Sequence, residues 1–96
     1  MPIEIVIAND HEIVRIGLKA TLEAAGMRVV ADVADGFAAF KAVEQHRPEL
    51  AVLNVQMPGG DGFSSLSRIK LDVPDTQVLM ISGIEKRYNQ KLWMRS

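Results

Sequence analysis

Short apolar runs alternate with stretches of helical spacing along this chain, and this alternation constrains the fold more than any other feature of the sequence. The apolar runs span residues 3–8, 28–33, 50–53 and 77–82, and the helical stretches span about 11–26, 36–46 and 62–71. The apolar runs are short and turn-forming residues bound them, so each predicts a strand. Strands that alternate with helices at this spacing form right-handed crossover units. The sequence therefore predicts an α/β fold with a doubly wound parallel sheet covered by helices on both faces.

The first helical stretch indicates which side of its helix is apolar. Val14, Leu18, Leu22 and Ala25 follow one another at intervals of about four residues, which stacks them on one helical face. Gly26 comes directly afterwards and is expected to cap the helix, because glycine adopts the left-handed conformation that ends many helices.

Length and composition exclude several classes of function. With 96 residues, a formal net charge of -1 and 48% hydrophobic residues, the chain is expected to fold as one globular domain. Nucleic acids and anionic membranes need a clustered basic surface, so DNA contact is expected only through another domain. The absence of cysteine excludes disulfides, thiolate metal sites and thiol catalysis. No apolar run reaches the roughly 18 residues of a spanning helix and no signal-peptide pattern occurs, so we expect a cytoplasmic protein without a membrane partner.

Polar side chains stand at the carboxyl ends of three predicted strands. Asn9 and Asp10 follow the first strand, Asn54 follows the third, and Ser82 ends the fourth. In open parallel sheets the ligand crevice lies at the carboxyl ends of the strands, so these four side chains are expected to converge on one edge. Each residue alone is also a common turn former or helix cap, which is the alternative explanation for its position.

The order of these residues, together with a glycine-rich loop after the third strand, carries a family resemblance. The pattern is Asn9-Asp10 followed by His11, a strand that ends at Asn54, the loop Met57-Pro58-Gly-Gly-Asp61-Gly62, and a strand that ends in Ser82. It resembles the receiver domain of two-component response regulators, most closely the receivers that precede a C-terminal helix-turn-helix DNA-binding domain. The resemblance covers residues 3 to about 85.

The resemblance implies a flavodoxin-like (CheY-like) sheet with strand order 2-1-3-4. Residues 1–96 are expected to form a single receiver-like domain that is truncated before the fifth strand and the fifth helix, because residues from about 84 show only a weak helical pattern. The family's phosphate-pairing lysine at the end of the fifth strand has no counterpart, since Lys86 and Lys91 lie too close to Ser82 to be matched to it.

In the family, an aspartate at the position of Asn54 becomes an acyl phosphate. Two acidic residues at the positions of Asn9 and Asp10 hold Mg²⁺ together with the backbone carbonyl at the position of Gln56. The hydroxyl at the position of Ser82 binds a phosphoryl oxygen. The loop residues that match the family are Met57, Pro58, Asp61 and Gly62.

Two amides replace two of these acids, and the chemistry changes with them. The amide of Asn54 is a very poor phosphoryl acceptor, because its nitrogen lone pair is delocalised and its oxygen carries no formal charge. Asn9 also removes one acid near the metal position, so Asp10 alone remains of three carboxylates. Mg²⁺ prefers hard anionic oxygens, so we expect its binding to be weak or absent and no other cofactor to be present.

These departures favour a degenerate receiver that is not an enzyme and is not phosphorylated at Asn54. It is expected to act in signal transduction and transcription regulation through protein contacts: a homodimer, a possible contact with a histidine kinase, and DNA only through an output domain outside this chain. One alternative is an active phosphoacceptor receiver with an engineered Asp-to-Asn block at Asn54. Another is a small-ligand sensor that uses Asn9, Asp10, Asn54 and Ser82 as hydrogen-bonding groups.

Overall fold

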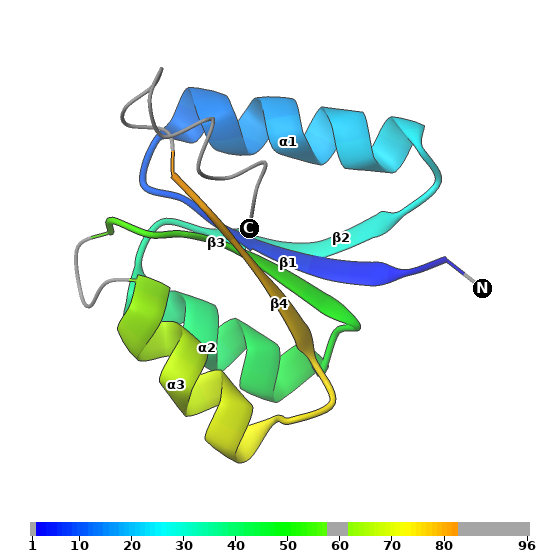
Figure 1. The fold of residues 1–96 in the computed structure, drawn as a ribbon. Coiled ribbons are helices and arrows are strands. Elements are labelled where there is room, and N and C mark those ends of the chain that lie inside the picture. Colours follow the sequence, from blue (N-terminus) through cyan, green and yellow to red (C-terminus); the bar gives the residue numbers. More distant parts are fainter. Residues whose placement is uncertain (1, 58–61, 83–96) are drawn as a thin grey trace, which may run out of the picture.

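The computed structural model describes residues 2–57 and 62–82, and strands and helices alternate strictly along them (Figure 1). The elements are β1 (Glu4–Ala8), α1 (Glu12–Ala24), β2 (Arg28–Val33), α2 (Gly36–His46), β3 (Leu50–Asn54), α3 (Gly62–Asp72) and β4 (Gln77–Ile81). Every predicted element is present, and each observed end lies within two residues of the predicted one. One small difference concerns the site: Asn54 is the last residue of β3 and does not follow it.

The four described strands form one parallel sheet in the order β2-β1-β3-β4, which confirms the predicted α/β fold and strand order. Helix α1 covers one face of the sheet, and α2 and α3 cover the other (Figure 1). The expectation of a missing fifth strand and fifth helix falls on residues 83–96, which lie outside the described residues.

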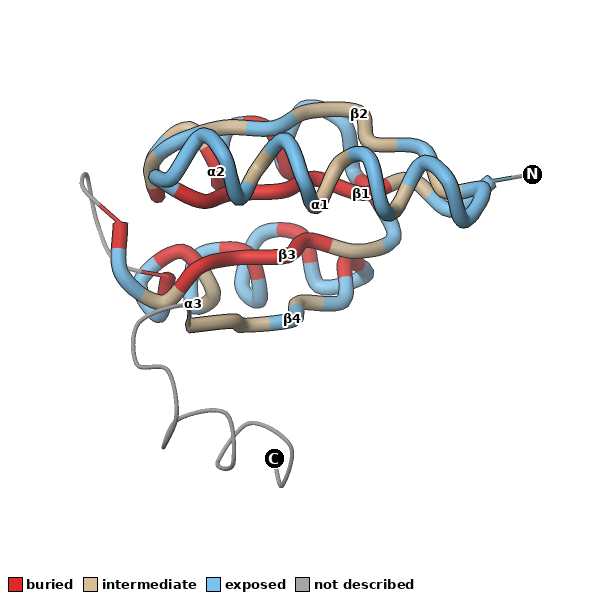
Figure 2. Tube along the Cα trace, turned by 90° about the horizontal axis from the view of Figure 1, so that it is seen from above, coloured by how far each residue is buried: buried red, intermediate tan, exposed pale blue. Residues whose placement is uncertain are grey.

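Two hydrophobic cores lie on the two faces of the sheet. The larger core lies beneath α2 and α3, where Val6 and Ala8 of β1 and Leu53 of β3 pack with Val43 and Ile69 of the helices. All five side chains are fully buried. Figure 2 shows β1 and most of β3 as continuous buried segments. Because successive side chains of a strand point to opposite faces, the neighbouring residues of β1 supply the other core.

The smaller core lies between the sheet and α1. Its buried members are Ile5, Ile7 and Val52, and Leu18 and Leu22 of α1 pack against them while only partly buried. No residue of α1 itself is buried. The helix is therefore pressed less deeply onto its face of the sheet than α2 and α3 are onto theirs.

The predicted apolar face of α1 is only half confirmed. Leu18 and Leu22 face the core, but Val14 is 42% exposed and Ala25 lies beyond the last helical residue. The helix ends there because Gly26 has a φ of 91°, and its N–H donates to the Glu23 carbonyl at 3.0 Å. This is the cap that the sequence predicts.

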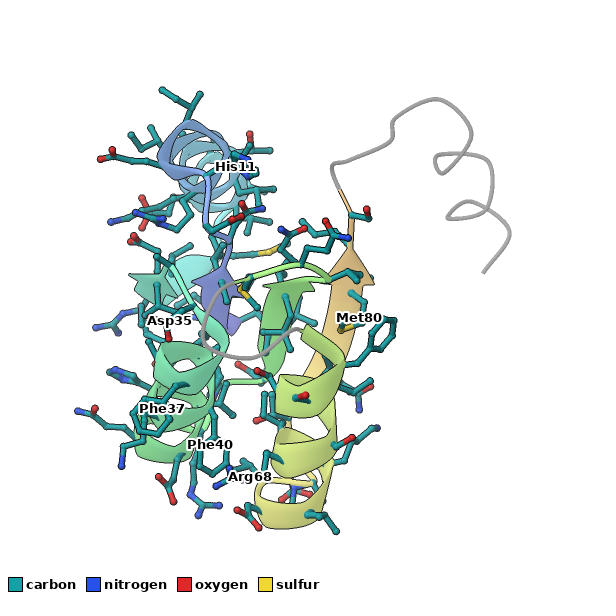
Figure 3. All side chains as sticks on the ribbon, turned by 90° about the vertical axis from the view of Figure 1, so that its left-hand side faces the viewer. His11, Asp35, Phe37, Phe40, Arg68 and Met80 are labelled. Carbon is teal, nitrogen blue, oxygen red and sulfur yellow. The ribbon has the colours of Figure 1, made fainter. Side chains whose placement is uncertain are left out.

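Helices α2 and α3 pack against each other as well as on the sheet. Ser65 Oγ of α3 donates a hydrogen bond to the Gly36 carbonyl at 3.1 Å. The Arg68 guanidinium lies 4.2 Å from the centroid of the Phe40 ring, and both side chains lie between the two helices (Figure 3). These contacts join the helices into one layer.

No helix formed by residues 2–57 or 62–82 is long and apolar enough to cross a lipid bilayer.

Candidate functional site

Asn9, Asp10, Asn54 and Ser82, which stand at or directly after strand ends, lie around one cavity at the carboxyl edge of the sheet. The cavity has a volume of about 240 Å³, and its lining residues are Asn9, Asp10, His11, Val14, Asn54, Gln56, Ile81 and Ser82. The parallel strands β1, β3 and β4 all end at this edge, which explains why residues separated by more than 70 positions in the sequence meet there.

Asn9 holds the start of α1 in place. Its side chain is buried, and its Oδ1 accepts a hydrogen bond from the His11 backbone N–H at 2.9 Å. The Asn9 backbone N–H donates to the Val33 carbonyl of β2 at 3.0 Å. An aspartate could accept the same bond from His11, so the turn does not require the amide. Asn9 therefore both stabilises the turn into α1 and lines the cavity.

Asn54 connects the loop after β3 to the loop after β1. Its side chain is 4% exposed, and its Nδ2 donates to the Gln56 carbonyl at 2.8 Å and lies 3.4 Å from Asp10 Oδ1. Both neighbours are hydrogen-bond acceptors, so the amide is oriented with its nitrogen toward them. The bond to Gln56 has good length, and the longer contact with Asp10 gains from the charge of the carboxylate.

Asp10 is the one carboxylate among the described residues that line the cavity. Its Oδ1 lies 3.1 Å from Nδ1 of His11, whose side chain is 70% exposed. Within residues 2–57 and 62–82 no group of three His, Cys, Asp or Glu side chains is placed to hold a metal ion. A magnesium ion prefers several hard oxygen ligands, whereas here an N–H donor points at the Asp10 and Gln56 oxygens. The donor set does not fit that ion.

The remaining predicted site residues have different surroundings. Ser82 lines the cavity next to Ile81, at the end of β4. Met57 is buried and belongs to the larger core. Gly62 begins α3 and donates its backbone N–H to the Val55 carbonyl at 2.8 Å. Pro58 and Asp61, like Lys86 and Lys91, lie outside the described residues.

A side chain at Gly62 would collide with the strand that carries Asn54. A Cβ atom there would meet the Asn54 backbone oxygen and would lie 2.7 Å from Cε of Met80. Glycine is therefore required for the close approach of α3 to β3 beside the site.

Arg15 also supports the site, although no motif in the sequence points to it. Its Nη1 donates to the Asn9 carbonyl at 2.8 Å, and its Nε lies 3.5 Å from Asp32 Oδ1 at the end of β2. The sequence offers one signal for this role, because Arg15 is a basic residue one turn into the helix that follows Asn9 and Asp10. The sequence alone did not show that this side chain turns back toward the strand ends.

Comparison with known proteins defines the class to which this fold and site belong. Residues 5–93 match the response regulator receiver domain, and the chain belongs to this family. It is 41% identical over 81 residues to the oxygen regulatory protein NreC of Staphylococcus epidermidis. The matched segment is 82% of this chain but only 37% of that protein, so the chain spans little more than a third of its relative.

Solved structures agree with the assignment. The signal receiver domain of NarL from Mycobacterium tuberculosis has a TM-score of 0.83 and 28% identity, and the match covers 98% of this chain and 77% of that one. The CheX–CheY–BeF₃–Mg²⁺ complex of Borrelia burgdorferi also has a TM-score of 0.83, with 25% identity over 99% of this chain and 72% of that one. The chain is thus a receiver domain of the NarL and NreC type.

Proposed function

We propose that this chain is a receiver domain that takes no phosphate at Asn54 and signals through protein contacts. The observation that carries the proposal is the buried amide at the end of β3, which turns its nitrogen toward the Gln56 carbonyl and Asp10. Attack on a phosphodonor requires a nucleophilic oxygen. The amide nitrogen is delocalised and already donates hydrogen bonds, and the amide oxygen carries no formal charge.

Among residues 2–57 and 62–82, the surroundings of Asn54 supply few of the charges that phosphoryl transfer uses. The reaction depends on a metal ion and other cations to stabilise the negative charge that develops. One similar solved structure is a complex that contains BeF₃ and Mg²⁺. In the part of this chain that the structure describes, Asp10 is the one carboxylate that lines the cavity, and the Asn9 side-chain oxygen accepts a hydrogen bond from the His11 N–H. This supports weak magnesium binding and no catalysis.

The family supports a proposal about the partners. Receiver domains are generally non-enzymatic signalling domains, and the NreC relative is much longer than this chain. We therefore assign the domain a role in transcription regulation, in which it controls an output domain outside these 96 residues and DNA is bound only there. A homodimer and a contact with a histidine kinase are the protein contacts through which it would act. A cytoplasmic location fits the absence of cysteine.

Incubation with acetyl phosphate and Mg²⁺ tests the central claim. Intact-mass spectrometry should show no gain of about 80 Da, the mass of one phosphoryl group. The matched control is Asn54→Ala, treated identically. A gain in the native protein that Asn54→Ala lacks would place phosphate on Asn54 and overturn the proposal.

An engineered Asp-to-Asn block on an active receiver is the first alternative. It accounts for Asn54 but not for Asn9, the second amide at an acidic position. The native coding sequence decides between the two, because an aspartate codon at position 54 would favour the engineered block.

A small-ligand sensor is the second alternative, and the cavity favours it. The cavity combines polar groups of Asn9, Asp10 and Ser82 with the apolar side chains Val14 and Ile81. Its volume of about 240 Å³ lies below the range of about 300–1,000 Å³ of typical ligand pockets, so any ligand would be small. Thermal-shift screening with metabolites and nucleotides tests this function, and no stabilisation by any compound would count against it.

A further inference from the structure

The most unusual feature of the site is the place that the Asn54 nitrogen occupies. A carboxylate oxygen of Asp10 and the backbone oxygen of Gln56 both point to it, from loops that follow two different strands. Two oxygens from separate loops that converge on one point repel each other unless something positive lies between them. A divalent cation can fill such a point, and here the positive ends of the two N–H bonds fill it.

We propose that the side-chain amide of Asn54 takes the structural place of a divalent cation, so that the loops after β1 and β3 keep one arrangement at any magnesium concentration. The inference deepens the proposed function, because it names what fixes the state of a receiver that takes no phosphate. It concerns metal dependence, however, and can fail independently of that function.

The amide suits this task because it has two hydrogens for two acceptors. Asn54 Nδ2 lies 2.8 Å from Gln56 O and 3.4 Å from Asp10 Oδ1, so its two hydrogens match the two acceptors in number. Asn54 is 4% exposed, so water competes little for these bonds. The amide thereby joins two segments that are 44 residues apart in the sequence.

Further contacts hold the two loops on either side of this connection. Asn9 Oδ1 accepts from the His11 N–H, and Arg15 Nη1 donates to the Asn9 carbonyl. On the other side, the Gly62 N–H donates to the Val55 carbonyl directly after Asn54. Every one of these bonds is made within the chain, and none requires an ion.

Asn54→Asp is the decisive variant, because it replaces the donor with an acceptor of almost the same shape. The new carboxylate would face the Gln56 oxygen and the Asp10 carboxylate, and the three oxygens would then need a cation between them. We expect this variant to unfold at a lower temperature than the native protein in excess EDTA. Millimolar MgCl₂ should raise its melting temperature by about 4 °C or more, because an ion that binds only the folded state stabilises that state.

The native protein should melt at the same temperature in EDTA and in MgCl₂, with NaCl added to match ionic strength. Asn54→Ala serves as the control without charge: it should be less stable than the native protein in both solutions and should not respond to MgCl₂. Adding Asp10→Asn to Asn54→Asp should abolish the response to MgCl₂. If the native protein is stabilised by MgCl₂ as much as Asn54→Asp is, the proposal is wrong.

Nuclear magnetic resonance provides a readout that does not depend on any variant folding. The two Nδ2 hydrogens of Asn54 should exchange slowly with solvent and have distinct shifts, and titration with MgCl₂ should leave these signals and the His11 and Gln56 amide signals unmoved. Fast exchange of both hydrogens, or movement of these signals with MgCl₂, would overturn the inference. A phosphoryl mass gain on Asn54 without any magnesium response would contradict the proposed function alone.

Discussion

The two faces of the sheet hold their helices by different means. On one face, α2 and α3 are held by apolar burial, with Val43 and Ile69 fully buried against the strands. On the other face, α1 has no buried residue. That helix is held instead by a partly buried apolar side and by Arg15, which reaches the Asn9 carbonyl and Asp32.

This difference matters because the polar contacts of α1 coincide with the site. Arg15 contacts the residue whose side chain starts the turn into α1, next to Asp10. The position of α1 and the geometry of the cavity are therefore coupled. On the opposite face, α2 and α3 are positioned mainly by packing, and α3 meets the site only at its first residue, Gly62.

The largest effect should come from removing apolar burial on the α2 and α3 face. Ile69→Ala is expected to lower the free energy of unfolding by about 2–5 kcal/mol, because it leaves a cavity in a fully buried site. Urea unfolding measures this loss. Leu71→Ala on the same helix is the control, since Leu71 is 78% exposed and should change stability by less than about 0.5 kcal/mol. If Leu18→Ala of α1 costs as much as Ile69→Ala, the two faces do not differ as described.

Two glycines, one on each face, should respond to alanine with opposite signs. Gly62→Ala should lower the free energy of unfolding by about 1–3 kcal/mol, because the new methyl group meets the Asn54 backbone oxygen and Met80. Gly17→Ala in α1 should raise it by about 0.5–1 kcal/mol, because nothing lies within 4 Å of the new Cβ and alanine favours the helix. Chemical denaturation of both variants checks the pair, and a loss of stability in Gly17→Ala would mean that α1 is more tightly enclosed than it is here.

Removal of the hydrogen bond that joins α1 to the Asn9 carbonyl should have a smaller effect on stability, and structural changes should be confined to the site. Arg15→Met keeps an aliphatic side chain but loses the bond to the Asn9 carbonyl, and should cost about 1–2 kcal/mol. The amide signals of Asn9, Asp10 and His11 should shift in the nuclear magnetic resonance spectrum. Lys19→Met is the matched control. Lys19 Nζ lies 3.7 Å from Asp32 Oδ2, and its side chain is 45% exposed. Its removal should therefore lower the free energy of unfolding by less than about 0.5 kcal/mol. If these signals do not shift in Arg15→Met, the position of α1 and the geometry of the site are not coupled.

The smallest effect should come from the helix caps. Asp35 accepts a hydrogen bond from the Ala38 N–H at 2.7 Å at the start of α2. Asp35→Ala should therefore lower the free energy of unfolding by about 1 kcal/mol, and the melting temperature should fall accordingly. Asp35→Ser keeps a capping oxygen and should restore most of it. His11, at the start of α1, makes no side-chain cap, so His11→Ala should leave the melting temperature nearly unchanged. A larger loss in His11→Ala than in Asp35→Ala would reverse the expected order.

Periodicity and turn residues act locally, so the sequence predicted the elements and the parallel sheet, whereas the strand order came from the family resemblance. The repeat of apolar residues placed β2 and α2 at their observed bounds, and Gly26 ended α1 as predicted. The same local reasoning extended the apolar face of α1 too far. Ala25 lies beyond the last helical residue, and Val14 is 42% exposed. The sequence does not show how closely packing draws a helix onto the sheet.

The sequence predicted which residues lie at the site but did not predict the contacts that they make. Strand ends are readable, so Asn9, Asp10, Asn54 and Ser82 were expected at one edge, and they line one cavity. The direction of the Asn54 amide depends on an acceptor 44 positions away, and the reach of Arg15 depends on the angle of α1. Such features depend on three-dimensional packing, which no local pattern encodes.

The hydrogen bonds of Asn54 are intramolecular, and in this they differ from any contact with an ion in solution. The occupancy of an ion site follows mass action and changes with dilution or competition, whereas a bond from Asn54 Nδ2 to Gln56 O forms with a probability that is set by the chain alone. The fraction of folded molecules that hold this bond thus does not follow the concentration of any binding ion.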